Sequence, residues 1–269
     1  MSIKLRVSCN LRFKIEDASA LIFMLRPFRG INQWIMREMY TIKPSVPVIE
    51  STDSYGNSCQ RLVAPKGNLV IHSSAEVITA AHADFASGLD FVEIQFLPND
   101  VLPFLLPSRY CESDRFGELA RDIVADALPG YDQVSLIVYW IRASIQYLPG
   151  SSDIPLSAME IYSRRFGVCR DLAHVGIALC RSISIPARFV AGYLQGLEPM
   201  DLHAWFEVYV GGRWYTFDPT QADLSGGRVV VAFGRDAADV PVFHQFGLGC
   251  ILSAMVVKVE QLDGHLSKV

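Results

Sequence analysis

One cysteine of the chain is placed where a nucleophile would be activated. Cys169 follows Gly167 by two residues, at the predicted start of a helix that runs to about Arg181. Unpaired amide hydrogens and the helix dipole stabilise negative charge at that end of a helix, and the thiolate is the reactive form of cysteine. Most residues after Cys169 are apolar, so we expect a buried central helix with its reactive end exposed at the tip. The pattern predicts a nucleophilic cysteine.

A predicted β-hairpin follows this helix along the chain. Residues 203–210 and 213–217 have the composition of strands, and the Gly-Gly pair between them is typical of a two-residue turn. Such a turn pairs Val210 with Arg213 and thereby sets the register of the other residues. The interpretation depends on the turn length, because a loop one residue longer would move every side chain of the second strand to the opposite face.

In this register His203 and Asp218 lie on the same face of the hairpin, since side chains alternate between faces. They are diagonal neighbours, about 7 Å apart at Cα. We expect Asp218 to accept the Nδ1–H of His203, so that Nε2 faces outward to a partner. A nucleophile, a base and an orienting carboxylate together predict a catalytic triad of Cys169, His203 and Asp218.

The surrounding sequence indicates which elements position these residues. Strand-like runs separated by turn signals fill residues 1–97, and three prolines in residues 97–110 predict a linker. Beyond the linker, helices come before the cysteine and strands after it, which favours an α+β fold over a βαβ alternation. The helices are expected at 113–127, 132–147 and 156–165, and the strands at 185–190, 193–194, 229–233 and 252–259.

These patterns predict two domains. Residues 1–100 would form a β-rich N-terminal domain, an antiparallel sandwich or barrel. Residues 101–269 would form the catalytic domain, with helices packed on an antiparallel sheet. The predicted fold class is therefore α+β.

The composition limits the classes of protein. With 51% apolar residues, 19% charged residues and a net charge of −4, the chain can bury a large core and lacks the basic surplus of a nucleic-acid binder. No stretch approaches about 18 consecutive apolar residues, and the start does not resemble a signal peptide. The six cysteines lack the tight spacing of a disulfide framework. We expect a reduced, cytoplasmic protein that binds neither nucleic acid nor membrane.

Three motifs, in this order, resemble those of the bacterial transglutaminase-like superfamily. They lie in RRFGVCRDLAHVGIALCRSISIPARFVAGYL (164–194), DLHAWFEVYV (201–210) and GRWYTFDPT (212–220). The resemblance assigns Cys169 as the nucleophile, His203 as the general base and Asp218 as the orienting acid. It also extends to the first hundred residues, which resemble the β-rich region that often precedes this core.

The resemblance implies a papain- or transglutaminase-like core and a thiol-dependent amide hydrolase, such as a protease, peptidase or isopeptidase. Cys169 would form a thioester acyl-enzyme with a peptide or protein substrate, and no cofactor or metal is implied. The backbone N–H of Cys169 is the natural first donor to the oxyanion. Gln146 and Tyr147 are the alternatives for the second donor.

Other functions stay open. An amine in place of water as the acyl acceptor would make the protein a transglutaminase, and the fold can also persist as an interaction module without catalysis. A metal site is disfavoured because the spacing of its candidate ligands does not resemble a zinc framework. Those candidates are Cys169, Cys180, His174 and His203. The sequence leaves the substrate and the oligomeric state open.

Several residues near the predicted triad have structural interpretations. Asp171 is expected as a first-turn carboxylate that favours the helix dipole, and His174 as a hydrogen-bonded core histidine. Cys180 lies three helical turns from Cys169 and is expected in the core. Arg188 is expected to pair with a buried carboxylate, either Asp171 or Glu207.

Overall fold

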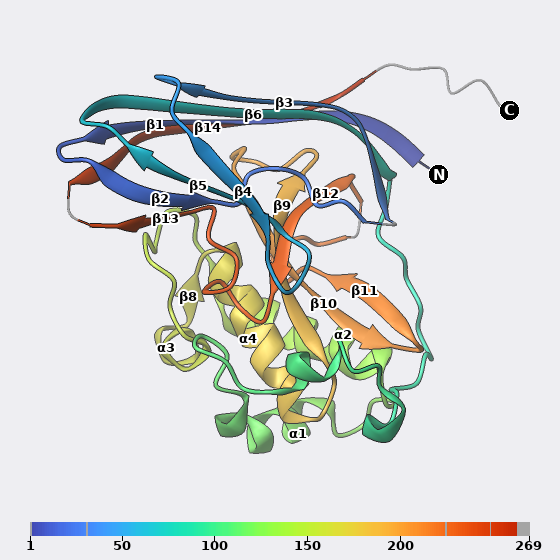
Figure 1. Cartoon of the computed structure of the whole chain (residues 1–269). Coiled ribbons are helices and arrows are strands. Elements are labelled where there is room, and N and C mark those ends of the chain that lie inside the picture. Colours follow the sequence, from blue (N-terminus) through green and yellow to red (C-terminus); the bar gives the residue numbers. More distant parts are fainter. Residues whose placement is uncertain (1, 31, 224, 248, 263–269) are drawn as a thin grey trace, which may run out of the picture.

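The upper half of the molecule is a sandwich of two four-stranded antiparallel sheets (Figure 1). We describe it from a computed structural model that covers residues 2–30, 32–223, 225–247 and 249–262. One sheet has the order β14 (Cys250–Gln261), β1 (Ser2–Ile15), β6 (Gly67–Ala80) and β3 (Gln33–Lys43). The other has the order β13 (Phe243–Phe246), β2 (Ser19–Phe23), β5 (Ser58–Ala64) and β4 (Val48–Thr52).

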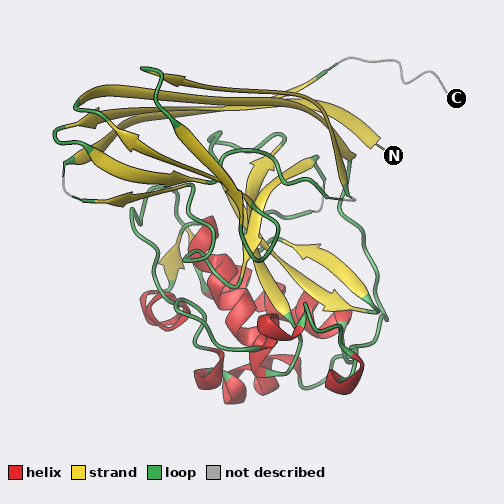
Figure 2. Cartoon of the chain, in the orientation of Figure 1, coloured by secondary structure: helices red, strands yellow, loops and turns green. Residues whose placement is uncertain are grey.

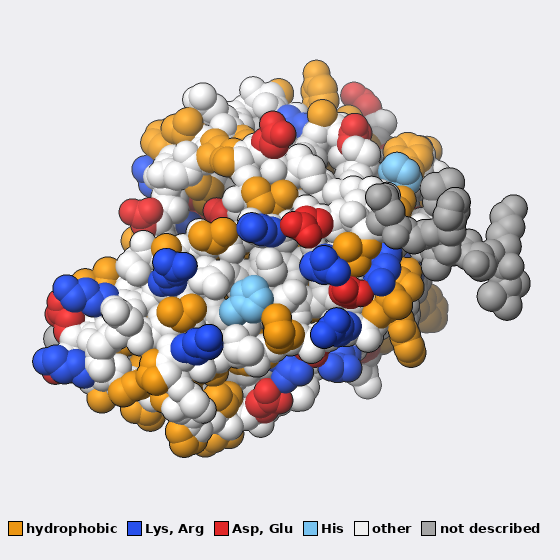
Figure 3. Space-filling view, turned by 90° about the horizontal axis from the view of Figure 1, so that it is seen from above, with side chains coloured by type: hydrophobic (Ala, Val, Ile, Leu, Met, Phe, Trp, Pro, Cys, Tyr) orange, Lys and Arg blue, Asp and Glu red, His pale blue; other side chains and the backbone are white. Residues whose placement is uncertain are grey.

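Alternating hydrophobicity explains why these segments form a sandwich. In β1 every second side chain from Leu5 to Ile15 is buried, and the residues between them are more exposed. The inward side chains bring the two sheets together: the ring of Phe13 packs edge-on against Phe23 of β2 and Phe243 of β13. On the outer face, basic, acidic and apolar side chains are interspersed (Figure 3). The predicted β-rich N-terminal half is confirmed.

The predicted extent of the catalytic domain, residues 101–269, is wrong at its C-terminal end. β13 pairs with β2, and β14 pairs along most of its length with β1, so the chain returns to the N-terminal sheets after residue 242. Sequence alone identified a strand at 252–259 but could not show its partner. Pairing across some 240 residues leaves no local signal, because it depends on matching two distant apolar faces.

The lower half carries the helices and the third sheet (Figure 2). The helices are α1 (Gly117–Val124), α2 (Tyr131–Ser144), α3 (Ala158–Arg164) and α4 (Cys169–Ser182), with 3-10 turns at Ile94–Phe96, Leu102–Leu105 and Ser113–Arg115. The sheet has the order β11 (Arg213–Phe217), β10 (His203–Val210), β9 (Ala187–Leu194) and β12 (Arg228–Gly234). Two short strands, β7 (Gln146–Tyr147) and β8 (Phe166–Gly167), pair in parallel. The predicted α+β fold is confirmed.

Helix α4 is the central element of this half. Its residues from Asp171 to Arg181 are buried, and it contacts α1, α2, α3, β9 and β10. Gly176 allows the close approach to β10, because a Cβ atom there would lie 2.5 Å from Cε1 of Phe206. The buried helix expected from the sequence is therefore present. None of the helices among the described residues is long and apolar enough to cross a membrane.

Two predicted helices are shorter than expected. The segment predicted as 113–127 is a 3-10 turn followed by α1, and the helix predicted to reach residue 147 ends at Ser144. Beyond Ser144 the chain becomes extended, and Gln146–Tyr147 pairs with the residues just before Cys169. This tertiary pairing overrides the helical propensity of the segment.

The turn at residues 53–57 joins the two halves. Asp53 closes the turn by accepting hydrogen bonds from the backbone of Tyr55 and Asn57. The buried Asn57 side chain then bonds to β12, donating to the carbonyl of Phe233 at 2.7 Å and accepting from its N–H at 3.0 Å. The sequence indicated a turn here, and the structure adds its role as a connector.

Candidate active site

Cys169 is the first residue of α4 and is half-buried. The helix begins there because Val168 is extended and its N–H is capped by the carboxylate of Asp171 at 3.2 Å. Asp171 itself is buried and also accepts from Arg170 at 3.2 Å. The expected first-turn carboxylate is thus present, with a defined capping role. The thiol lies at the end of the helix where amide hydrogens converge.

The hairpin has the register expected from its Gly-Gly turn. Val210 pairs with Arg213, and the pairing continues to Phe206 with Phe217. Both turn glycines have positive φ, 57° and 86°, as a tight turn of this kind requires. The observed register matches the predicted one, and the side chains of His203 and Asp218 are in contact, as predicted.

The orientation of the His203 ring differs from the prediction. Nε2 of His203, and not Nδ1, lies 2.8 Å from Oδ2 of Asp218. Nδ1 is buried and has no hydrogen bond of ordinary geometry to any described residue. The thiol of Cys169 is close enough to interact with the imidazole electrostatically. Strand pairing determines the face on which a side chain lies but not the rotation of the ring, so the sequence could not decide which nitrogen meets the carboxylate.

His203 and Asp218 interact strongly because both side chains are fully buried. Burial alone would lower the pKa of His203, but the hydrogen bond to Asp218, the interaction with Cys169 and the negative charges of both raise it to about 9. Burial likewise opposes ionisation of Asp218, yet His203, Arg228 and Thr220 keep the pKa of this carboxyl below its usual value. The site therefore favours an imidazolium paired with the carboxylate of Asp218.

Three residues that the sequence analysis missed hold Asp218 in place. The Thr220 hydroxyl donates to Oδ1 of Asp218 at 2.8 Å, and its N–H donates to the same oxygen at 3.0 Å. Arg142 donates to the backbone carbonyl of Asp218 at 2.7 Å, and Nη2 of Arg228 lies 3.4 Å from Oδ2. An Asp followed two residues later by Thr is a common local turn, so Thr220 had a signal. The two arginines belong to other elements, α2 and β12, and no local sequence pattern indicated their contacts with Asp218.

Tyr147 is the better of the two candidates for a second oxyanion donor. Its pairing with Gly167 places it beside the strand that leads into Cys169. Burial, together with the charges of Cys169, Asp218 and Asp201, raises the pKa of its hydroxyl to about 12, so it remains a proton donor. Gln146 is exposed, and its backbone N–H is occupied by the carbonyl of Arg165 at 2.8 Å.

The structural interpretations of nearby residues hold. His174 is fully buried, with Nδ1 2.9 Å from the carbonyl of Leu156 and Nε2 accepting from the N–H of Ala237 at 3.2 Å. Arg188 pairs with Glu207, whose Oε2 lies 2.6 Å from Nη2. Among the described residues, no three His, Cys, Asp or Glu side chains gather in a geometry that suits a metal ion.

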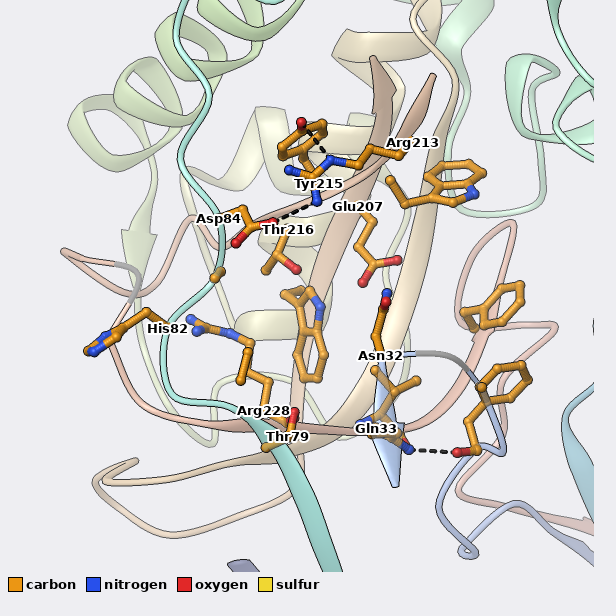
Figure 4. Close-up of a pocket in the computed structure, with 18 of the residues that line it drawn as sticks. Asn32, Gln33, Thr79, His82, Asp84, Glu207, Arg213, Tyr215, Thr216 and Arg228 are labelled. Atoms are coloured by element: carbon orange, nitrogen blue, oxygen red, sulfur yellow. Dashed lines mark hydrogen bonds and ion pairs between the residues drawn. The ribbon is translucent and has the colours of Figure 1, made fainter. Parts of the chain in front are cut away.

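A cavity of about 430 Å³ lies beside the site, between the third sheet and the N-terminal half (Figure 4). The Glu207–Arg188 pair and Trp205 form part of its wall, and the centre of a Trp205 ring lies 6.1 Å from the centre of the His203 imidazole. Arg228 lines the cavity as well as contacting Asp218. One side of the β10–β11 hairpin therefore faces a space shared by both halves.

Comparison with known proteins identifies the family of this chain. The sequence model of the "Transglutaminase-like superfamily" matches residues 117–219, which include Cys169, His203 and Asp218. A solved structure described as a "Putative Cysteine Protease from Cytophaga hutchinsonii" is 35% identical in sequence. The match covers 98% of this chain and 92% of the other chain, with a TM-score of 0.90.

Two relatives from mycobacteria also match along much of their length. An uncharacterized protein of Mycobacterium tuberculosis is 29% identical, with 88% of this chain and 85% of the relative aligned. An uncharacterized protein of Mycobacterium leprae is 28% identical, with 66% of this chain and 68% of the relative aligned. With the structural match over nearly the whole chain, these similarities show that the chain belongs to the transglutaminase-like superfamily.

Proposed function

We propose that the protein is a thiol-dependent amide hydrolase, acting on peptide or isopeptide bonds through Cys169, His203 and Asp218. The observation that carries the proposal is the buried pair of His203 and Asp218, 2.8 Å apart, beside a half-buried cysteine at a helix N-terminus. An imidazole held by a carboxylate next to a thiol is the arrangement that activates cysteine as a nucleophile.

In the proposed reaction the thiolate of Cys169 attacks the carbonyl carbon of the amide. The tetrahedral intermediate collapses as the C–N bond breaks, and the imidazolium of His203 gives its Nδ1 proton to the departing amine. A thioester between Cys169 and the acyl group remains. His203 then takes a proton from water, whose oxygen attacks the thioester and releases the acid and the thiolate. Asp218 stays ionised and stabilises the imidazolium through Nε2.

The negative oxygen of the intermediate needs donors that are in place before the reaction. The N–H of Cys169 is at the first turn of α4, where the carbonyls of a preceding turn are missing. The hydroxyl of Tyr147 is the proposed second donor, because it stays protonated and is close enough to Cys169 for the two groups to interact electrostatically. Replacing Tyr147 by Phe would remove this donor and keep the ring.

The experiment that tests the proposal compares hydrolysis of a peptide library with incorporation of a labelled primary amine. Wild type, Cys169→Ala and Cys59→Ser are assayed together; Cys59 is also half-buried but lies in β5, away from the site. We expect peptide cleavage by wild type and Cys59→Ser and none by Cys169→Ala. Amine incorporation without cleavage would instead assign a transglutaminase. Absence of both reactions in wild type would favour a non-catalytic interaction module.

A further inference from the structure

Arg228 is a buried cation that contacts Asp218 of the proposed His203–Asp218 pair. It is the first residue of β12, is 8% exposed, and its Nη2 lies 3.4 Å from Oδ2 of Asp218. The same carboxylate oxygen lies 2.8 Å from Nε2 of His203. Asp218 therefore stands between two cationic groups, one of which lies outside the segment that the family model matches, residues 117–219.

We propose that Arg228 is a positioning residue, which keeps the carboxylate of Asp218 ionised and directed at Nε2 of His203. Its role in catalysis rests on the proposed function, because Arg228 would act through Asp218 and His203 and not touch the substrate. The imidazole orientation that it supports is the one that leaves Nδ1 for Cys169.

Electrostatics explains how a second cation helps to stabilise this carboxylate. Asp218 is almost completely buried, and burial favours the neutral carboxyl over the carboxylate. Without Arg228, this cost would be offset by the two hydrogen bonds from Thr220 and by His203, whose positive charge is lost when it gives up its proton. The guanidinium of Arg228, 3.4 Å from Oδ2, would keep Asp218 ionised when His203 gives up its proton during the reaction.

Other charged groups surround this carboxylate and must be considered in any titration. Arg142 contributes a permanent positive charge from α2, and Asp223 contributes a negative charge near both arginines. The groups that face Asp218 or its cations are Cys169 on α4, His203 on β10, Tyr147 on β7, Arg142 on α2, Arg228 on β12, and Thr220 and Asp223 in the loop after β11. Among these, Arg228 and His203 are the cationic side chains that contact the carboxylate itself.

The N-terminal half holds Arg228 in this position. The hydroxyl of Thr79, at the end of β6, donates to the carbonyl of Arg228 at 2.8 Å. Two residues further along β12, the side chain of Gln33 bonds to both the N–H and the carbonyl of Val230 at 2.8 Å. Figure 4 shows Gln33, Thr79 and Arg228 together at one end of the cavity. The sandwich thereby contributes to the site through a strand that it anchors.

The test measures the ionisation of Asp218 directly, by carbon NMR of its carboxyl group in the full-length protein. In Arg228→Gln we expect this carboxyl to titrate about one pH unit higher than in wild type, because it has lost a cation. Arg228→Lys keeps a charge and should titrate close to wild type. If Arg228→Gln does not fold, Arg228→Met carries the same expectation, because it fills a similar volume without a charge.

Arg213→Gln is the matched control. Arg213 also lines the cavity, but it pairs with the exposed Asp84 and does not contact Asp218. We expect no change in the titration of Asp218 in this variant. In Thr79→Val, which frees the backbone of Arg228, a shift smaller than that of Arg228→Gln but in the same direction is expected.

A second readout follows the consequence for the thiol. The rate at which iodoacetamide alkylates Cys169 at neutral pH should fall about tenfold to a hundredfold in Arg228→Gln, as expected for a displaced reactive pair. An unchanged titration of Asp218 in both uncharged variants would overturn the inference. Failure of the proposed function is a separate result: it would appear as equal activity in wild type and Cys169→Ala, whatever the carboxyl titration shows.

Discussion

At the residue scale, Cys169 differs from the other five cysteines in its surroundings. Burial raises the pKa of each of the others, to about 12 for Cys9, with further contributions from nearby carboxylates in some cases. A protonated thiol is a poor nucleophile. Cys169 instead lies at a helix N-terminus beside an imidazole whose pKa is raised to about 9.

Alkylation should therefore be selective for Cys169. Brief treatment of the native protein with iodoacetamide at neutral pH is expected to modify Cys169 and leave the other five cysteines unmodified, as read by peptide mass spectrometry. His203→Gln removes the imidazole and should slow the modification at least tenfold. Modification of Cys169 no faster than of a free model thiol would contradict the activated-nucleophile interpretation.

The raised pKa of His203 also predicts how stability depends on pH. Its folded-state pKa of about 9 exceeds the ordinary 6.5, so its contribution to stability is complete below pH 6.5 and is lost as the pH rises through 9. As the pH rises from 6 to 10, we expect deprotonation of His203 to lower the free energy of unfolding by roughly 1 to 3 kcal/mol.

Urea denaturation of wild type and His203→Gln at a series of pH values measures this contribution. The difference between the two proteins isolates His203 from the other titrating groups. A difference in stability that stays constant from pH 6 to pH 10 would show that the imidazole is not protonated preferentially in the folded state.

At the scale of elements, the site depends on how closely α4 approaches β10. The helix carries Cys169 and the strand carries His203, so their separation sets the distance between thiol and imidazole. Gly176 lies under the ring of Phe206, and there is no room for a methyl group at this position. The Gly-Gly turn has the corresponding role for Asp218, since it sets the register of β11 against β10.

Gly176→Ala should separate these two elements slightly. The added Cβ forces the ring of Phe206 or the helix to move, which costs about 1 to 2 kcal/mol after the gain in helix propensity. We expect slower alkylation of Cys169 and a lower urea midpoint. In the double variant with Phe206→Leu, the smaller side chain should partly restore the alkylation rate and the urea midpoint. Equal decreases of these two quantities in the single and the double variant would argue against packing as the cause.

At the scale of the whole molecule, the sandwich and the helical half act as one structure. β12 belongs to the third sheet, yet it is bonded to the N-terminal half through Asn57, Gln33 and Thr79. β13 and β14 complete the two N-terminal sheets from the far end of the chain. The N-terminal half is thus part of the support of the site and not an independent appendage.

Asn57→Ala tests this connection. It leaves the N–H and the carbonyl of Phe233 without their side-chain partner inside the molecule, and we expect a loss of about 2 to 4 kcal/mol in the free energy of unfolding. Asn10→Ala, a half-buried residue of β1, is the matched control and should change stability by much less. Equal effects of the two substitutions in urea denaturation would show that Asn57 does not hold the halves together.

Local patterns in the sequence determined much of this protein. The apolar helix after Cys169, the Gly-Gly turn and the period-two strands predicted α4, the β10–β11 register and the face shared by His203 and Asp218, because each depends on neighbours within a few residues. Only the tertiary structure decided the rotation of the His203 ring, the return of β14 to β1 and the approach of Arg228 to Asp218. Those contacts depend on the packing of the whole core, and no local spacing in the sequence predicts such packing.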